Sequence, residues 1–262
     1  MKRMNYTDIE EFYASHPESK RFKTRCGQLE FLTTLHYLEK YIEPGMRILE
    51  IGAGTGEYSL YFSKHGYEVD SVELLEHNIE LFRESVTATD KIRIYQGNAT
   101  NLSMLEANSY DITLLLGPMY HLIMVEEQIT ALSEAVRVTK PNGLLFVAYC
   151  MQDAVIIRHG FMKQDICFPK RTDFSAFKCK SKKPNVIELH TRPEIDVLVG
   201  HFPVSRLHFV GTDMLGVYFG EALETMPVAL FDQFLQYHYS ICERADLVGI
   251  TGHSLDILRK SR

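Results

Sequence analysis

Short apolar segments alternate with helical patterns along the first 150 residues, and this alternation constrains the fold more than any other feature. The apolar segments cover residues 46–51, 67–72, 92–95, 111–116 and 143–149. Between them, apolar side chains recur at helical spacing, and glycine or proline closes most of these stretches. Strands joined by helices through short loops form a parallel sheet, so we predict a doubly wound α/β fold.

The alternation stops between residues 151 and 184 and then returns in a shorter form. We expect helices over 28–41, from Arg192 to about Val199 and over 227–243, and strands over 207–210 and 253–258. The chain is therefore predicted to be one domain of four parts. These parts are an N-terminal helical cap (1–45), a core (46–150), an inserted lid (151–190) and a part that completes the sheet (191–262).

The segment from Glu50 to Glu57 places three glycines, Gly52, Gly54 and Gly56, between the first strand and the next helix. Glycine lets the backbone turn sharply and lets a ligand approach main-chain N–H groups. The spacing is G-x-G-x-G, whereas dinucleotide-binding loops have G-x-G-x-x-G. Glu50 and Glu57 flank the loop and would repel a pyrophosphate. The loop therefore favours a ligand that is cationic here, such as a sulfonium or an amino group.

Two further polar positions follow the next strands. Glu73 ends the second strand, 17 residues after Gly56, where a carboxylate can accept hydrogen bonds from both hydroxyls of a ribose. The alternative is that its charge only suits the start of a helix. After the third strand, Asn98 and Ala99 offer a side-chain amide and a backbone N–H to an adenine edge. The alternative for Asn98 is that it closes a turn.

These segments, in this order and spacing, resemble class I S-adenosylmethionine-dependent methyltransferases over about residues 25–150. The resemblance is carried by residues 48–56, Glu73, 97–99, 110–112 and 140–144. Residues 151–262 are similar to the variable, substrate-facing half of small bacterial members. The resemblance implies a Rossmann-like, mostly parallel sheet of seven strands whose last strand runs antiparallel, with the cofactor over the C-terminal strand ends.

The resemblance also implies that S-adenosylmethionine is the cofactor, S-adenosylhomocysteine the product, and residues 46–150 the binding core. Glu50 would face the amino group, Glu73 would hold the ribose, and Asn98 with Ala99 would hold the adenine. The family more often has Asp at the Asn98 position, but an amide oxygen still accepts a hydrogen bond. The other expected cofactor contacts are Gly52, Ala53, Gly54, Gly56, Tyr58, Leu74 and Leu116. No metal is expected.

The segment after the fourth strand, Gly117-Pro118-Met119-Tyr120-His121, lies where an acceptor must meet the methyl group. Methyltransferases of DNA-base amines have Asn or Asp, Pro, Pro and an aromatic residue here, so this segment counts against exocyclic base methylation. Tyr120 and His121 are the catalytic candidates, Tyr120 as a pocket wall and His121 to orient an acceptor or accept a proton near neutral pH. The alternative is that His121 caps the next helix and Tyr120 packs in the core.

Outside the core, His190 and Arg192 are candidate substrate-binding residues, with surface or interface roles as the alternative. Arg21 and Arg25 lie on a segment able to fold over the cofactor, and we favour surface roles for them. Residues 158–183 hold eight Lys or Arg and two Asp, a net charge of +6, so the rest of the chain carries −12. This basic stretch favours an anionic acceptor or RNA, or else is a solvated lid, which we prefer.

The chain carries −6 overall, which argues against a general nucleic-acid binder. Five cysteines without a C-x-x-C pair, no signal peptide and no bilayer-length apolar run indicate a cytoplasmic protein away from membranes. We predict a methyltransferase that acts on a small molecule by in-line transfer. The alternatives are an RNA or protein methyltransferase, a protein that binds S-adenosylmethionine without catalysis, and a nicotinamide oxidoreductase.

Overall fold

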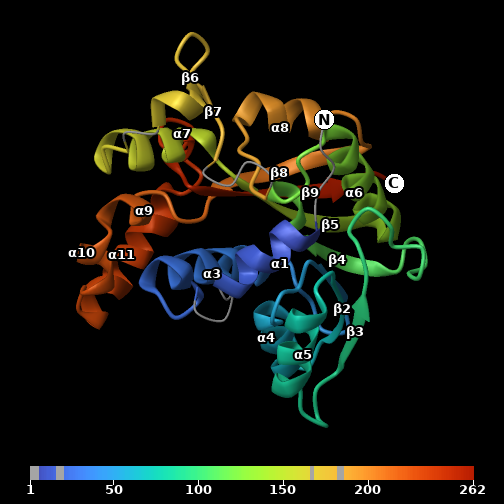
Figure 1. Ribbon diagram of the computed structural model, residues 1–262. Coiled ribbons are helices and arrows are strands. Elements are labelled where there is room, and N and C mark those ends of the chain that lie inside the picture. Colours follow the sequence, from blue (N-terminus) through green and yellow to red (C-terminus); the bar gives the residue numbers. More distant parts are fainter. Residues whose placement is uncertain (1–5, 16–20, 166–167, 182–185) are drawn as a thin grey trace.

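Seven strands form one sheet in the computed structural model, which describes residues 6–15, 21–165, 168–181 and 186–262. The strand order is β3-β2-β1-β4-β5-β9-β8 (Figure 1). The strands are β1 (Arg47–Ile51), β2 (Glu68–Glu73), β3 (Ile92–Gln96), β4 (Tyr110–Leu115), β5 (Thr139–Cys150), β8 (Val204–Gly211) and β9 (His253–Lys260). Strand β9 runs antiparallel to β5 and β8, whereas β1 to β5 pair in parallel. The predicted fold, with an antiparallel last strand, is confirmed.

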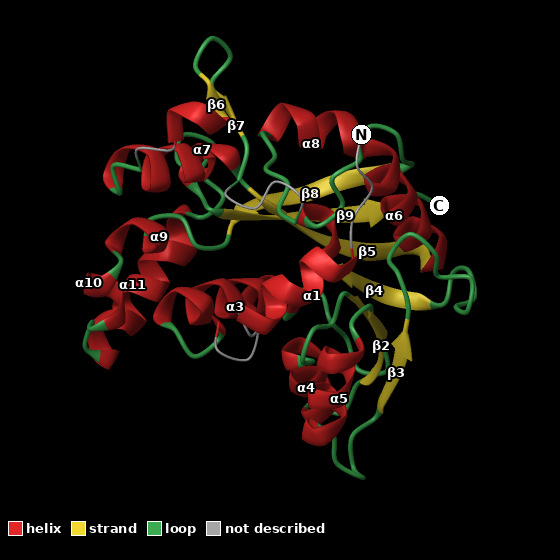
Figure 2. Cartoon of the chain, in the orientation of Figure 1, coloured by secondary structure: helices red, strands yellow, loops and turns green. Residues whose placement is uncertain are grey.

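Helices cover both faces of this sheet (Figure 2). They are α1 (Tyr6–Ser15), α3 (Arg25–Leu38), α4 (Glu57–Lys64), α5 (Glu76–Ser85), α6 (Val125–Val138), α7 (Gln152–Val155), α8 (Arg192–Val199), α9 (Gly216–Phe219), α10 (Glu221–Glu224) and α11 (Val228–Ile241). Helix α8 begins at the predicted residue because Thr191 and Glu194 form a capping box and Pro193 follows directly. None of the helices among the described residues has the length and apolar character needed to cross a bilayer.

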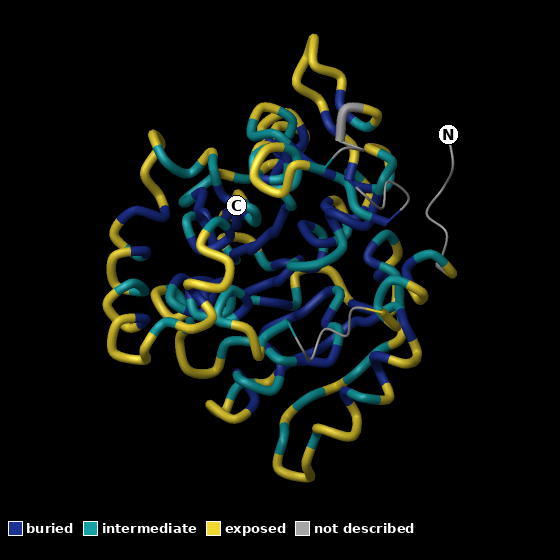
Figure 3. Tube along the Cα trace, turned by 60° about the vertical axis from the view of Figure 1, so that its left-hand side comes forward, coloured by how far each residue is buried: buried dark blue, intermediate teal, exposed yellow. Residues whose placement is uncertain are grey.

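Alternate residues along each strand point to opposite faces and build two separate cores. In β1, Ile48 packs with residues of α3, α4 and α11, whereas Leu49 and Ile51 pack with α6 and α8. The strands are buried from both sides, which explains why β4 is a nearly continuous apolar run. The buried strands at the centre and the exposed outer loops are visible in Figure 3.

The order of the strands reverses between β1 and β4, and this reversal places the site. From β1 the chain continues to β2 on one side, and from β4 it continues to β5 on the other. The loops that follow β1 and β4 therefore meet at the C-terminal edge of the sheet. They touch directly, since a Cβ on Gly52 would lie 2.7 Å from Cδ of Pro118.

The segment predicted as an inserted lid folds as α7, a π-helix (Ile156–Met162) and a two-stranded hairpin of β6 (Thr172–Asp173) and β7 (Lys178–Cys179). Cys167, Lys182 and Lys183 lie outside the described residues. The other cysteines, Cys26, Cys150, Cys179 and Cys242, are free thiols. Helices α1, α9 and α10 have no counterpart in our predictions.

Candidate functional site

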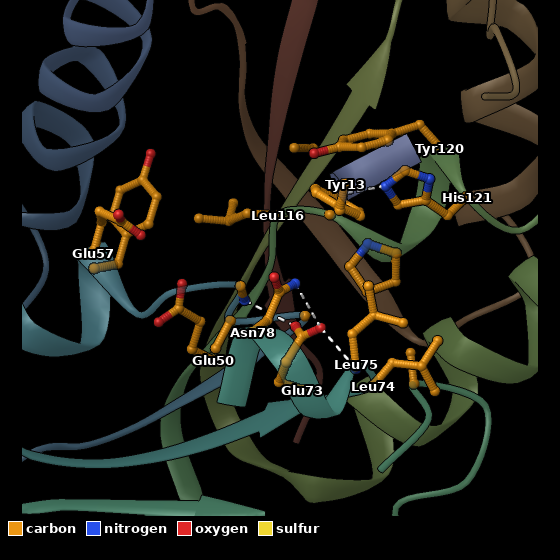
Figure 4. Close-up of a pocket in the computed structure, with 18 of the residues that line it drawn as sticks. Tyr13, Glu50, Glu57, Glu73, Leu74, Leu75, Asn78, Leu116, Tyr120 and His121 are labelled. Atoms are coloured by element: carbon orange, nitrogen blue, oxygen red, sulfur yellow. Dashed lines mark hydrogen bonds between the residues drawn. The ribbon is translucent and has the colours of Figure 1, made fainter. Parts of the chain in front are cut away.

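A cavity opens where the loops after β1 and β4 meet. Three carboxylates, Glu50, Glu57 and Glu73, lie on one side of it, and Tyr120 and His121 lie on the other (Figure 4). Ten of the residues predicted to contact the cofactor line this cavity: Glu50, Gly52, Ala53, Gly54, Tyr58, Glu73, Leu74, Asn98, Ala99 and Leu116. The structure thus brings together side chains that are far apart in the sequence.

The glycine loop turns as its sequence requires. Gly52, Gly54 and Gly56 all have positive φ angles, of +75°, +58° and +85°, where other residues are strained. Gly56 does not line the cavity. It precedes α4, and a Cβ there would lie 2.1 Å from Cε2 of Phe82, so this glycine lets the loop pack against α5. Its predicted contact with the cofactor stays a prediction.

Glu50 is almost fully buried at the end of β1. Its Oε2 accepts hydrogen bonds from the backbone N–H of Ser59 (3.0 Å) and from the Ser59 hydroxyl. Its Oε1 accepts none from a described residue. Burial raises the pKa of Glu50 to about 8, and the nearby charges of Glu57 and Glu73 add to this rise while the Ser59 bonds oppose it. The Glu50 carboxyl therefore holds its proton more tightly than an ordinary glutamate does.

Glu73 anchors the glycine loop as well as facing the cavity. Its Oε2 accepts from Gly54 N (2.8 Å), and its Oε1 accepts from Leu75 N (3.0 Å) and Asn78 Nδ2 (3.2 Å). A carboxylate has about four lone-pair sites, so roughly one is left, on Oε2. Glu73 in this conformation accepts from one ribose hydroxyl, and the predicted grip on both hydroxyls requires Asn78 to move.

Asn98 closes a turn, which was the alternative considered for it. Its Oδ1 accepts from the backbone N–H and the hydroxyl of Thr100, both at 3.0 Å. The amide oxygen that was expected to meet an adenine amine is thus already occupied. Asn98 and Ala99 still line the cavity, and Ala99 retains the predicted backbone position.

The aromatic side of the cavity is tied to the N-terminal helix. His121 Nδ1 lies 2.8 Å from the carbonyl oxygen of Val186, and His121 Nε2 lies 2.8 Å from the hydroxyl of Tyr13 in α1. Because a carbonyl only accepts, Nδ1 carries the proton and Nε2 accepts from Tyr13. Burial lowers the pKa of His121 to about 4. His121 is therefore neutral near pH 7, and in this conformation its Nε2 is occupied by the Tyr13 hydroxyl, so its role toward an acceptor stays a prediction.

Several cavity residues were missed or underrated in the sequence. Tyr13 belongs to no recognisable motif, and Arg21 was expected mainly at the surface. Arg21 lines the cavity and donates a hydrogen bond to Glu30, another lining residue. Tyr58 lines the cavity and also packs its ring 4.7 Å from that of Phe31. Arg25 stacks over Phe231 away from the cavity, as expected of it.

His190 and Arg192 do not line the cavity, and their prediction as substrate-binding residues is corrected. His190 is buried and packs its ring 5.2 Å from that of Tyr149. Arg192 donates to Asp196 (2.8 Å) and lies over the ring of Phe209. Both sit at the α8 end of the insertion, on the face of the sheet that α8 covers.

Comparison with known proteins agrees with this geometry. Residues 49–147 match a family described as a methyltransferase domain. A demethylmenaquinone methyltransferase of Renibacterium salmoninarum is 35% identical over 106 residues, 40% of this chain and 41% of the relative. A Talaromyces variabilis protein named as an S-adenosyl-L-methionine-dependent Diels-Alderase is 33% identical over 103 residues, 38% of this chain and 34% of the relative. The chain spans less than half the length of these curated relatives.

A solved structure from Thermotoga maritima, described as a possible histamine N-methyltransferase, matches over almost the whole chain. The comparison covers 98% of this chain and 100% of that one, with a TM-score of 0.63 and 19% identity. At this identity the likeness concerns the fold alone. The matched family region, 49–147, contains the glycine loop, Glu73 and the segment after β4.

Proposed function

Since residues 49–147 match a family described as a methyltransferase domain, we propose that this chain transfers the methyl group of S-adenosylmethionine to a small-molecule acceptor. The observation that carries the proposal is the meeting of three carboxylates and a positive-φ glycine loop in one cavity. Carboxylates attract the positive charges of a sulfonium and an amino group and repel a diphosphate. The site thus suits a cationic donor better than a nicotinamide dinucleotide.

The cavity lining fits S-adenosylmethionine chemically. Glu50 keeps Oε1 for an amino group, and Glu73 keeps one acceptor position for a ribose hydroxyl. Gly117 has no side chain where a Cβ would lie 3.6 Å from the Gly52 carbonyl, which leaves room beside the loop. Arg21 is the one Arg or Lys among the lining residues, and it is bonded to Glu30. The cavity therefore has no cation left over for an anionic donor.

When bound, S-adenosylmethionine supplies a methyl group on a positively charged sulfur, which an acceptor displaces in line. The chain has mainly to position the acceptor, since the leaving group is already activated. We place Tyr120 and His121 on the acceptor side. His121 forms hydrogen bonds with Tyr13 of α1 and with the Val186 carbonyl, and so fixes this wall of the cavity. The Tyr13 hydroxyl is a further polar group of the same wall. A neutral His121 suits an acceptor that needs no early proton loss.

Two alternatives to a small-molecule methyltransferase are each supported by a specific observation. The basic stretch 158–183 supports an RNA or protein acceptor, but Lys178 pairs with Glu194 outside the stretch, which offsets one of its positive charges. The relative named as a Diels-Alderase supports use of the cofactor without methyl transfer.

We also retain the cap (1–45), core, lid (151–190) and completing part (191–262) as a proposed division of one domain.

Two measurements test the proposed function. Calorimetric titration should show S-adenosylhomocysteine binding and no binding of NAD, and NAD binding alone would overturn the assignment. Incubation with methyl-labelled S-adenosylmethionine and an acceptor panel should then transfer label to a small molecule. Label transferred only to RNA or protein would replace the acceptor class. Tight binding with no label transferred at all would favour the non-methylating alternative.

A further inference from the structure

A second cavity lies next to the first along the β5–β9 ladder. Ala148 and Leu255 are partners in this ladder and line the first cavity, whereas Cys150 and His253, partners two residues further on, line the second. Residues two apart on a strand point to the same face. At a rise of about 3.3 Å per residue, the two sets of lining residues are only about 7 Å apart along the strand.

The two cavities share a wall. Arg21 and Glu30 line both, and the Arg21 guanidinium donates to Glu30 Oε1. Glu30 Oε2 in turn lies 3.7 Å from His253 Nδ1. The boundary between the two cavities thus includes the Arg21–Glu30 ion pair.

Most of the charged side chains that line the second cavity are ion-paired. Arg21 pairs with Glu30, His253 with Asp213 (2.7 Å), and Arg171 with Asp165 (2.6 Å). Each of these ion pairs is formally neutral when the histidine is charged. Burial alone would lower the pKa of His253, but Glu30, Cys150 and Asp213 hold it well above its ordinary value.

Arg158, in the π-helix, is the cation left over. Its side chain lines the second cavity and makes no hydrogen bond or ion pair with any residue in the described part of the chain. The remaining wall is largely apolar and includes Ala154, Val155, Ile187, Leu189 and Val217. A half-buried guanidinium in an apolar wall is a strong site for a carboxylate, which it binds through two parallel hydrogen bonds.

We propose that the second cavity is a subsite for one part of the acceptor: it takes an apolar segment bearing one carboxylate, held by Arg158, while the reactive group of the same molecule reaches past the Arg21–Glu30 pair to the Tyr120 side of the first cavity. This inference rests on the proposed function and names its substrate class. One unpaired guanidinium matches a carboxylate, whereas a phosphate monoester carries nearly two negative charges. The apolar lining matches the body of the molecule.

The test is calorimetry on the full chain saturated with S-adenosylhomocysteine, using octanoate and 3-phenylpropanoate, their primary amides, and phenyl phosphate as probes. At least one carboxylate should bind roughly tenfold or more tightly than its amide, the change expected for one charged hydrogen bond. Arg158→Gln should remove this preference and leave the affinity for S-adenosylhomocysteine unchanged. Arg83→Gln, at an exposed arginine outside both cavities, should keep the preference.

The outcomes separate the two proposals. If S-adenosylhomocysteine does not bind the wild type, the proposed function fails. If it binds, three results would overturn the present inference. These are no preference for any carboxylate over its amide, tighter binding of phenyl phosphate than of both carboxylates, and a preference that survives in Arg158→Gln. Arg158→Lys, which keeps the charge and loses the paired donors, should retain part of the preference. If neither variant folds, the wild-type contrast between carboxylate and amide decides.

Discussion

Among single residues, Glu50 controls how the first cavity responds to pH. Burial, with Glu57 and Glu73 nearby, raises its pKa to about 8 in the folded chain, against 4.5 for an ordinary glutamate. A carboxyl that holds its proton more tightly in the folded state destabilises that state as pH rises above the unfolded value, and this effect grows until about pH 8. Each unit of pKa difference corresponds to about 1.4 kcal/mol.

We therefore expect Glu50→Gln to increase the free energy of unfolding, relative to wild type, at pH 8 and to have little effect at pH 5. Gln retains an oxygen that accepts from Ser59, so the hydrogen bonds survive. Urea unfolding at both values of pH measures the difference. Glu76→Gln, at an exposed carboxylate, is the control. An equal gain at the two values would show that ionisation of Glu50 is not the cause.

Glu73→Ala tests the ribose contact. We expect it to weaken binding of S-adenosylhomocysteine by about 2 kcal/mol or more, because charged hydrogen bonds to the ribose are lost. The substitution also frees Gly54 N, so the loop loses an anchor that it has in the wild type. Glu76→Ala, three residues on in α5, should bind like wild type. Unchanged affinity of the Glu73 variant in calorimetry would remove this residue from the site.

At the scale of elements, the site requires the loop after β1 to touch the segment after β4. Gly52 and Gly45 both have positive φ, +75° and +86°, but only Gly52 has a neighbour where a Cβ would be, Pro118 at 2.7 Å. Gly45→Ala should lower the free energy of unfolding by about 1 kcal/mol from backbone strain alone. Gly52→Ala should lower it by a further 1–3 kcal/mol or so through the collision.

Binding distinguishes these two glycine variants as well. Gly52→Ala should weaken S-adenosylhomocysteine binding, and Gly45→Ala should not, since Gly45 lies outside the cavity. Chemical unfolding and calorimetry give the two readouts. Equal losses of stability in the two variants would mean that Pro118 moves aside and that the loops are not held against each other.

A second pair of elements, α1 and the short helix Pro118–Tyr120, forms the side of the first cavity that we propose for the acceptor. We expect Tyr120→Phe and His121→Ala to lower turnover more than affinity for S-adenosylhomocysteine, because both act on the acceptor wall and neither holds the donor. His77→Ala, at an exposed histidine, is the control. Labelled methyl transfer to an acceptor found in the panel measures turnover. Wild-type turnover in both variants would return these residues to a packing role.

Elements with their own periodicity could be predicted from the sequence, and those held by distant contacts could not. The strands were predicted because burial on both faces leaves a short apolar run, and the long helices because burial of one face leaves apolar residues at helical spacing. Helix α1 has Ile9, Phe12 and Tyr13 at helical spacing but was not predicted, and Ile9 is buried where the distant residues Leu75 and Val186 lie against it. Strand β5 begins at Thr139, before the predicted start, because Pro141-Asn142-Gly143 resembles a turn although the strand continues with a shift in register.

The same distinction holds within the site. The glycine loop and Glu73 are local to one strand–helix–strand unit, so spacing identified them. The bond between Tyr13 and His121 spans 108 residues, and no local pattern announces it. The occupied oxygen of Asn98 and the low pKa of His121 depend on packing, which a motif does not describe.

At the scale of the whole molecule, the antiparallel strand β9 is joined to β8 by a buried carboxylate. Asp213 accepts from Thr251 Oγ1 (2.7 Å), Gly252 N (2.7 Å), His253 N (3.0 Å) and His253 Nδ1 (2.7 Å). Burial would raise the pKa of Asp213, but the charge and hydrogen bonds of His253, with the Thr251 bond, lower it. Asp213 and His253 therefore hold the ends of β8 and β9 together beside the second cavity, which both residues line.

The last prediction concerns this pair. Removing one partner of a buried ion pair costs about 3–5 kcal/mol, so Asp213→Ala should lower the global free energy of unfolding by that amount near pH 6. The pKa of Asp213 is lower in the folded chain than in the unfolded chain, so its charge stabilises the fold above about pH 4, and this effect is lost as pH falls further. The pKa of His253 is higher in the folded chain, so its charge stabilises the fold below pH 6.5, and this effect is lost as pH rises through the folded pKa.

The deficit of Asp213→Ala should therefore be largest between about pH 4 and 6.5, and it should shrink on both sides. Asp246→Ala breaks an exposed pair with Arg244 and should leave stability unchanged at every pH, because exposed ion pairs contribute little. Urea unfolding across this range compares the two aspartates. A deficit that does not vary with pH would assign the loss to packing and hydrogen bonds alone, and strand β9 would then be held without help from the charge of His253.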